Sequence, residues 1–199
     1  MKLPSIKIKY STLIKKGSKS IHDDFFIVLI TGYQGSGKTW FAVFDVYENQ
    51  PKRKIRTNIK TLKIPGRDIE YFTTLDEIYS DNDNEYIYII DEVSKKFTKD
   101  SKQDLRFYSW LQQSRKHRRY VYLITQEYIQ VPTWLRGVAN RVYTTSKLGF
   151  LPLFMTALGV PVLDEETKEW KADNYKYIIY KRTKEVSSMY DTFEQINTL

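Results

Sequence analysis

The stretch G-Y-Q-G-S-G-K-T at residues 32–39 decides the fold, because it has the spacing G-x-x-x-x-G-K-S/T of a phosphate-binding loop. Glycines let backbone N–H groups close around phosphates, and the positive end of a following helix favours an anion. We expect Lys38 to reach the β- and γ-phosphates of a nucleotide, and Thr39 to offer a hydroxyl oxygen to Mg²⁺. A glycine-rich turn without a ligand is the alternative interpretation.

The segments on either side of the loop have the patterns that this loop requires. Residues 25–31, F-F-I-V-L-I-T, form a continuous apolar run that is typical of a strand buried on both faces of a parallel sheet. Trp40, Val43, Phe44 and Tyr47 follow at i, i+3, i+4 and i+7, which predicts an amphipathic helix that a proline then ends. The order strand, glycine loop, helix is the context of a nucleotide-binding loop.

Strands and helices then alternate along the chain. We expect further strands at residues 52–60, 86–90, 120–125, 141–145 and 175–180, the last of them a possible edge strand. We expect helices at residues 74–79, 101–114 and 132–138. Ser101 and Asp104 offer a capping box for the second of these helices. Such alternation predicts an α/β domain, a three-layer sandwich around a mainly parallel sheet. We take residues 1–199 as one domain, with a core at about 25–145 and 146–199 as its C-terminal extension.

Polar side chains end two of the predicted strands. Asp91 and Glu92 follow the apolar run 86–90, and Gln126 follows the run 120–125. Phosphoryl transfer needs an acid that orients the metal and a group that positions the attacking water. We therefore predict that Asp91 holds Mg²⁺ through water, that Glu92 is the general base, and that Gln126 senses the γ-phosphate or orients the water. Acidic residues that merely end a strand are the alternative. The predicted nucleotide-binding residues are Gly32, Tyr33, Gln34, Gly35, Ser36, Gly37, Lys38, Thr39 and Asp91.

The composition limits the possible partners and excludes several kinds of site. With 32 basic and 24 acidic residues among 199, the chain has a net charge of +8, which favours a polyanion such as nucleic acid. Because cysteine is absent and only two histidines occur, a disulfide scaffold, a thiolate zinc site and a cysteine nucleophile are excluded, and a histidine metal site is improbable. A basic cluster alone also fits an ordinary solvated face. The clusters lie at residues 2–19, 52–67 and 115–119.

No segment has the pattern of a membrane span or a secretory signal. The longest uncharged run, residues 149–163, holds 15 residues and two prolines, whereas a spanning helix needs about 20 apolar residues. We interpret this run as a core or interface segment, with a docking loop as the alternative. The N-terminus lacks the apolar core and small-residue cleavage site of a signal peptide. We therefore expect a protein without a transmembrane segment in the host cytoplasm, with the virion as a second possible location.

Three stretches resemble the additional-strand, catalytic-glutamate class of phosphate-loop ATPases and, within it, the FtsK/HerA superfamily. They are G-Y-Q-G-S-G-K-T with the later R-T-N-I, then I-I-D-E, then R-K-H-R-R-Y-V-Y-L-I-T-Q. The first, with its T-N-I segment, is similar to the Zot proteins of filamentous phages. A bare ATPase core of about this size resembles the viral genome-packaging branch.

The resemblance implies a RecA-like fold and hydrolysis of ATP with Mg²⁺, coupled to translocation of double-stranded DNA. It also implies a homo-oligomeric ring, a hexamer, in which an arginine of one subunit completes the site of its neighbour. By position in the motif, Arg115 is the first candidate for that arginine finger, followed by Arg118 and Arg119. Capsid or portal proteins are possible further partners.

Two other classes of enzyme and one binding function stay open at this stage. A helicase or replication-associated ATPase would separate strands. A small-molecule kinase would suit the length, although the acidic pair after the strand suits water activation and no arginine-rich lid is visible. A purely structural nucleotide-binding protein would leave Glu92 without a role.

Overall fold

The sheet is built around the apolar run that precedes the glycine loop. All six residues of this strand, β1 (Phe26–Thr31), are buried. It pairs in parallel with β5 (Tyr120–Ile124) on one side and with β6 (Arg141–Lys147) on the other. Because β1 is interior and covered on both faces, its sequence is apolar without alternation. The computed structural model describes residues 25–79, 85–149 and 153–191.

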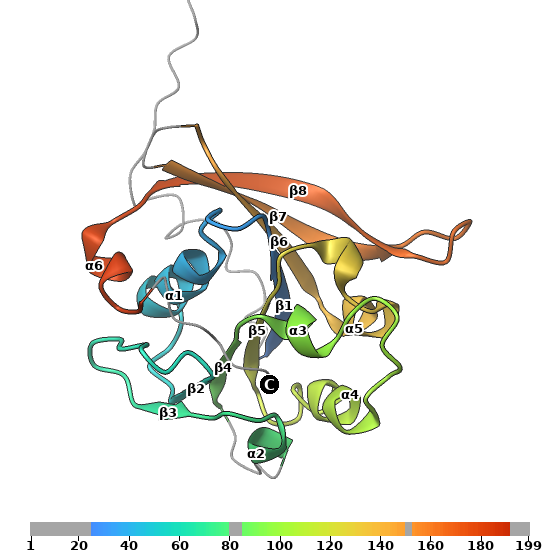
Figure 1. Cartoon of the computed structure of the whole chain (residues 1–199), viewed down its shortest axis with the longest axis horizontal. Helices are drawn as coiled ribbons and strands as arrows, with labels where there is room; N and C mark the ends of the chain where they lie inside the picture. The colour runs from blue at the N-terminus through green and yellow to red at the C-terminus, as the bar shows by residue number, and fades with distance from the viewer. Residues whose placement is uncertain (1–24, 80–84, 150–152, 192–199) are drawn as a thin grey trace, which may run out of the picture.

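Eight strands form one sheet in the order β3-β2-β4-β5-β1-β6-β7-β8 (Figure 1). The six strands from β3 to β6 are parallel, whereas β7 and β8 are antiparallel to their neighbours. Strand β5 lies between the loop strand β1 and the acidic strand β4. The other strands are β2 (Ile55–Thr57), β3 (Ile69–Tyr71), β4 (Ile87–Ile90), β7 (Leu153–Leu163) and β8 (Trp170–Lys181).

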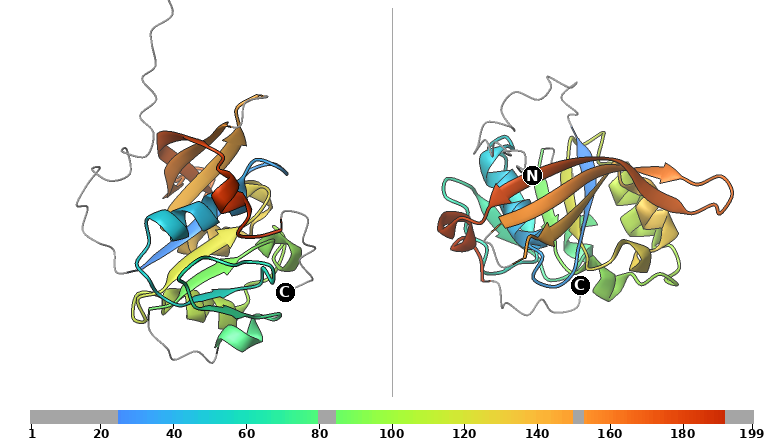
Figure 2. Two further views of the ribbon diagram at one scale, coloured as in Figure 1. Left: turned by 90° about the vertical axis from the view of Figure 1, so that its left-hand side faces the viewer. Right: turned by 90° about the horizontal axis from the view of Figure 1, so that it is seen from above.

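Helices cover both faces of the sheet and make the predicted three layers (Figures 1 and 2). Helices α1 and α6 pack on one face around Trp40 and Val186, and helices α2 to α5 pack on the other around Phe107 and Leu135. The α/β fold with a mainly parallel sheet is thus confirmed. The helices are α1 (Lys38–Glu48), α2 (Asp76–Tyr79), α3 (Val93–Lys96), α4 (Leu105–Gln112), α5 (Thr133–Val138) and α6 (Lys184–Ser187), with a 3₁₀ turn η1 (Tyr128–Gln130).

The uncharged run at residues 149–163 contains the whole of β7, and residues 150–152 of the run lie outside the described residues. Phe154 and Ala157 are buried in the sheet, whereas Val160 and Val162 are exposed. The hairpin of β7 and β8 passes beyond the helices (Figure 2). The prediction of a core segment therefore holds for the first half of the strand. None of the helices in the described part of the chain has the length and apolar character that a membrane span requires.

The start of α4 differs from the predicted capping box. The helix begins at Leu105, and Asp104 itself is the cap, because its carboxylate accepts hydrogen bonds from the backbone N–H groups of Arg106 and Phe107 at 3.0 and 2.9 Å. Ser101 lies in the preceding loop, where its hydroxyl accepts from the Thr98 N–H at 2.9 Å. The helix is shorter than predicted because an aspartate satisfies free N–H groups as well as a serine does.

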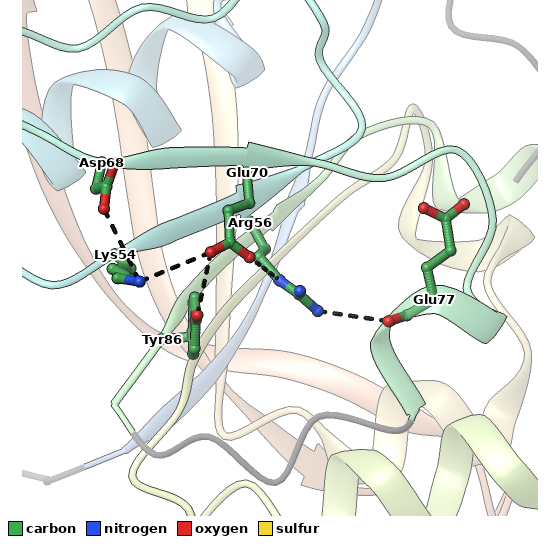
Figure 3. A network of polar contacts seen from close by, with 6 residues as sticks. All are labelled: Lys54, Arg56, Asp68, Glu70, Glu77 and Tyr86. Carbon is green, nitrogen blue, oxygen red and sulfur yellow. Dashed lines mark hydrogen bonds and ion pairs between the residues drawn. The ribbon is translucent and has the colours of Figure 1, made fainter.

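A polar network stabilises the edge strand β3 (Figure 3). The Glu70 carboxylate accepts from Arg56 Nε at 2.7 Å and from the Tyr86 hydroxyl at 3.3 Å, and it lies 3.8 Å from Lys54 Nζ. The Arg56 hydrogen bond is the main reason why the pKa of Glu70 is lowered. Strand β3 was not predicted, because three partly exposed residues carry too short a pattern.

Candidate nucleotide-binding site

The parallel strands bring all predicted catalytic groups except Arg115 to one edge of the sheet. Strand β1 runs into the glycine loop, β4 into Asp91 and Glu92, and β5 into Gln126. Asn58 follows β2 at the same edge, although no role was predicted for it. Because the carboxyl ends of parallel strands bind ligands in α/β sheets, this edge is the candidate nucleotide site.

The glycine loop turns tightly between β1 and α1. The N–H of Gly32 donates to the backbone carbonyl of Gln126 at 2.8 Å, which ties the loop to the end of β5. Gly35 and Gly37 have φ angles of +75° and +88°, in the left-handed region that favours glycine. A Cβ on Gly32 would lie 2.4 Å from the carbonyl oxygen of Thr145, so no side chain fits there.

Strands β6 and β7 support the loop from behind, which the sequence did not indicate. The hydroxyls of Ser36 and Thr145 share a buried hydrogen bond of 2.8 Å. The ring of Phe154 lies so close to Gly37 that a Cβ there would meet it at 2.9 Å. Thr145 and Phe154 thus restrict the shape of the loop that would cradle phosphates.

Lys38 is half-buried within the loop. Its Nζ donates to the carbonyl oxygens of Gly32 and Tyr33 at 2.8 and 3.1 Å. Burial lowers the pKa of its ammonium group, while the nearby charges of Asp91 and Glu92 oppose that shift. An anion within the loop would stabilise the charged form, as a phosphate-binding lysine requires.

Asp91 lies beside the first turn of α1 and is only 8% exposed. Its Oδ2 accepts from the Thr39 hydroxyl at 2.8 Å. Burial raises the pKa of its carboxyl, and the hydrogen bond from Thr39 opposes that shift. The hydroxyl and the carboxylate are hard oxygen ligands in contact, which is the donor set that Mg²⁺ uses alongside phosphates and water.

Asn58 holds the backbone of Asp91 with two hydrogen bonds. Its Nδ2 donates to the Asp91 carbonyl at 2.9 Å, and its Oδ1 accepts from the Asp91 N–H at 2.8 Å. Both residues are buried. The T-N-I segment that marked the family resemblance therefore supplies a residue that positions the acidic strand end.

Glu92 has an unusual backbone conformation for a glutamate. Its φ is +58°, in the left-handed region, and it precedes the single turn of α3. Its N–H donates to Asp91 Oδ1 at 2.8 Å, and its carboxylate lies 4.0 Å from Lys95 Nζ. Such strain is concentrated at functional sites, where the surrounding structure imposes it. Glu92 thus stands next to the predicted metal ligand, where a general base is expected.

Three further residues of the predicted site have exposed side chains. The side chains of Tyr33, Gln34 and Gln126 are exposed. The backbone carbonyl of Gln126 accepts the hydrogen bond from Gly32, which fixes the position of Gln126 at this edge.

The predicted arginine finger lies at the opposite edge of the sheet. Arg115 is exposed and lies five positions before Tyr120, where β5 begins, so it is near the end of that strand opposite the glycine loop. Arg118 pairs with Glu85 at 3.4 Å. Arg119 is 1% exposed and donates to the Trp110 carbonyl at 3.2 Å, with its guanidinium 4.9 Å from the Trp110 ring. Arg119 is therefore a buried structural residue. The prediction that it could serve as an arginine finger is wrong.

Much of the basic cluster at residues 52–67 has structural partners. Lys54 and Arg56 belong to the network around Glu70, and Arg67 donates to the carbonyls of Val46 and Gln50 at 2.8 Å, at the end of α1. The cluster at residues 2–19 lies outside the described residues.

A family profile described as "Zonular occludens toxin (Zot)" matches residues 66–191, well over half of the chain. The chain belongs to the Zot family. The matched region includes Asp91, Glu92 and Gln126, and the glycine loop precedes it. A search of curated proteins finds no match.

Solved structures agree with the Zot family fold. The N-terminal domain of zonular occludens toxin from Neisseria meningitidis is 23% identical, with a TM-score of 0.61, and the alignment covers 83% of this chain and 98% of that one. The genome packaging NTPase B204 from Sulfolobus turreted icosahedral virus 2, in complex with sulfate, is 12% identical, with a TM-score of 0.50 and coverage of 76% and 96%. The RadB recombinase is 14% identical, with a TM-score of 0.52 and coverage of 79% and 87%. This Zot family chain therefore has a RecA-like P-loop ATPase fold.

Proposed function

We propose that this protein hydrolyses ATP and uses the free energy to move DNA, as a viral genome-packaging motor does. The observation that carries the proposal is the contact between Thr39 and Asp91 at 2.8 Å, with Lys38 and Glu92 as chain neighbours of that pair. This is the arrangement that phosphoryl transfer to water requires.

Each side chain has a distinct task in the proposed reaction. Lys38 neutralises charge on the β- and γ-phosphates, and Thr39 and Asp91 would hold Mg²⁺. When bound, Mg²⁺ withdraws charge from the phosphate oxygens. Glu92 takes a proton from the attacking water as general base. Asn58 keeps Asp91 in place by binding its backbone, and Gln126 lies where it could orient the water.

The proposal of DNA as the track rests on charge and on fold similarity. The net charge of +8 suits a polyanion. The relative B204 is described as a genome packaging NTPase, and this supports a similar role here. We propose a closed hexameric ring in which Arg115 of one subunit reaches the site of the next, with double-stranded DNA as its substrate. Capsid or portal proteins as partners, and a location in the host cytoplasm or the virion, are part of the same proposal.

ATP hydrolysis measured with and without duplex DNA, together with the mass in solution, tests this function. Hydrolysis that duplex DNA stimulates, in a particle of several subunits, is the expected result. Strand separation would favour the helicase alternative instead. Transfer of phosphate to a small molecule would favour a kinase, and absence of hydrolysis with intact nucleotide binding would favour a structural role.

A further inference from the structure

Ser36 is a buried side chain at the centre of an otherwise open phosphate loop. It is only 5% exposed, whereas the side chains of Tyr33 and Gln34 are exposed. Gly35 and Gly37, on either side of it, both have left-handed backbone conformations. Among the described residues, no atom lies within 4 Å of the place where Gly35 would carry a Cβ. The centre of the loop is therefore supported from its inner side, where Ser36 is its side-chain contact.

The Ser36 hydroxyl forms a hydrogen bond with Thr145 of β6. The two oxygens are 2.8 Å apart, and Thr145 is 2% exposed. The Thr145 hydroxyl in turn donates to the carbonyl of Thr31, the last residue of β1, at 3.3 Å. Since a hydroxyl has one proton, Ser36 is the donor to Thr145. Two hydrogen bonds in series thus connect the centre of the loop to the strand that precedes it.

The two hydroxyls also occupy the space beside the first glycine of the loop. A Cβ on Gly32 would lie 2.5 Å from Ser36 Oγ and 2.8 Å from Thr145 Oγ1. Such distances are too short for any side chain, so the absence of a Cβ at Gly32 makes room for the pair. The start of the loop, its centre and β6 are therefore packed together as one unit.

We propose that Thr145 is a positioning residue for the phosphate loop, and that it acts through Ser36 to set the affinity for the phosphates of a nucleotide. The loop would bind phosphates with backbone N–H groups, which must point toward the ligand together. A segment with glycine on both sides of one residue has much conformational freedom to lose on binding. An anchored loop has already lost part of that freedom, so it binds more tightly. The inference rests on the proposed nucleotide site and gives β6 a part in it.

This role predicts a particular change in kinetics. The N–H groups of the loop meet the phosphates both in the bound substrate and in the transition state. Loss of the anchor should therefore raise the KM for ATP and leave kcat nearly unchanged. A residue needed only for folding would instead lower the amount of active protein, which reduces kcat and leaves KM unchanged.

The test measures binding of a fluorescent ATP analogue to the full chain, and then hydrolysis over a range of ATP concentrations. Thr145→Val keeps the shape of the side chain but leaves the Ser36 hydroxyl without its acceptor. We expect about tenfold weaker binding, the factor that corresponds to one buried hydrogen bond. Thr145→Ser restores the hydroxyl and should recover most of the parent affinity. Thermal unfolding of each variant identifies losses that come from misfolding.

Thr144→Val is the matched control on the same strand. The Thr144 side chain is exposed, and its hydroxyl pairs with that of Thr31 at 3.2 Å and not with Ser36. This variant loses a hydroxyl–hydroxyl contact one position away from Thr145. It should bind the analogue like the parent protein.

A double-mutant cycle tests whether Thr145 acts through Ser36. Ser36→Ala alone should also weaken binding about tenfold. Ser36→Ala combined with Thr145→Val should weaken it about tenfold and not about a hundredfold, because the same hydrogen bond is lost in all three variants. Additive losses, parent-like binding by Thr145→Val, or a fall in kcat at unchanged KM would each overturn the inference.

The outcomes also separate this inference from the proposed function. If hydrolysis is absent but nucleotide binding depends on Ser36 and Thr145, only the motor proposal fails. If duplex DNA stimulates hydrolysis and all variants have the KM of the parent, only the positioning role fails. A parent protein that binds no nucleotide would overturn both.

Discussion

Thr39 donates a hydrogen bond of 2.8 Å to Asp91, which joins the first turn of α1 to the end of β4 across 52 positions of the chain. The hydroxyl and the carboxylate are therefore in direct contact. Such preorganisation avoids the cost of rearrangement during the reaction. It also means that a change at either residue, or at a residue that positions one of them, should affect the nucleotide site directly.

Lys38→Ala is expected to abolish nucleotide binding or turnover, because it removes the point charge that meets the β- and γ-phosphates. Binding of a fluorescent ATP analogue and release of phosphate measure the two effects. Lys52→Ala is the control, since Lys52 is an exposed lysine outside the loop. If the Lys38→Ala variant hydrolyses ATP as fast as the parent protein, the glycine loop is not the nucleotide site.

Glu92→Gln is expected to keep ATP affinity and lose hydrolysis, because the amide keeps the shape of the side chain but cannot take a proton. Nucleotide binding and single-turnover hydrolysis should be measured on the same preparation. If binding falls as much as hydrolysis, Glu92 acts as a structural residue or a metal ligand and not as the base.

Asn58→Ala is expected to lower the free energy of unfolding by about 2 to 4 kcal/mol, because it leaves the buried N–H and carbonyl of Asp91 without their partner. Turnover should fall as well, since Asp91 loses its support. Urea unfolding measures the first effect. Asn49→Ala, at an exposed asparagine after α1, should cost less than about 1 kcal/mol, and an equal loss in both variants would contradict the positioning role.

The strand–loop–helix unit and the acidic strand end could be predicted because each is encoded locally. The run before the loop is apolar throughout because β1 is covered on both faces. Few residues other than glycine adopt the positive φ angles that the loop requires. Asp91 and Glu92 were found because a buried strand that ends in two acids is unusual. In each case a few adjacent residues carry the whole pattern.

The other parts of the site depend on contacts between distant segments. Asn58 follows a strand of three residues, and only the order of strands brings it beside Asp91. Thr145 and Phe154 support the loop from more than 100 positions away. The capping box failed for a local reason, because serine and aspartate three residues apart are both good caps.

Glu70 is expected to make stability depend on pH in the acid range. Its pKa is lowered in the folded protein, first by the hydrogen bond from Arg56 and then by the charges of Arg56 and Lys54. The unfolded chain therefore binds the proton more tightly, so the contribution is complete above the unfolded pKa of about 4.3 and is lost as pH falls through the folded pKa.

Glu70→Gln should remove this dependence, so that parent and variant differ in stability at pH 7 and converge at an acid pH below the folded pKa of Glu70. Because the carboxylate is 39% exposed, solvent limits the difference to about 1 kcal/mol or less. Urea unfolding at both values of pH measures it, with Glu48→Gln, at an exposed glutamate that ends α1, as the control. A difference that grows toward acid pH would show that the sign is wrong.

Arg115→Ala is expected to leave ATP binding nearly intact and to lower turnover about 10³-fold or more, as loss of an arginine finger does. Arg115 is exposed just before β5, at the edge opposite the loop, so it would serve the site of a neighbour and not its own. A closed ring repeats that head-to-tail contact at each interface. Arg119→Ala, by contrast, should mainly destabilise the fold, because Arg119 is buried against Trp110.

Mixing two inactive variants tests whether Arg115 acts across the interface. When Arg115→Ala subunits are combined with Glu92→Gln subunits, some interfaces join an intact Glu92 to an intact Arg115 of the neighbour, and hydrolysis should return at those sites. Each variant alone should stay inactive. A mixture that stays inactive while both variants co-assemble, or full hydrolysis by the parent at dilutions where it is monomeric, would mean that no neighbouring arginine is needed. Exposed Arg118 would then be the next residue to substitute, because its pair with Glu85 lies on the surface where an incoming charge could replace it.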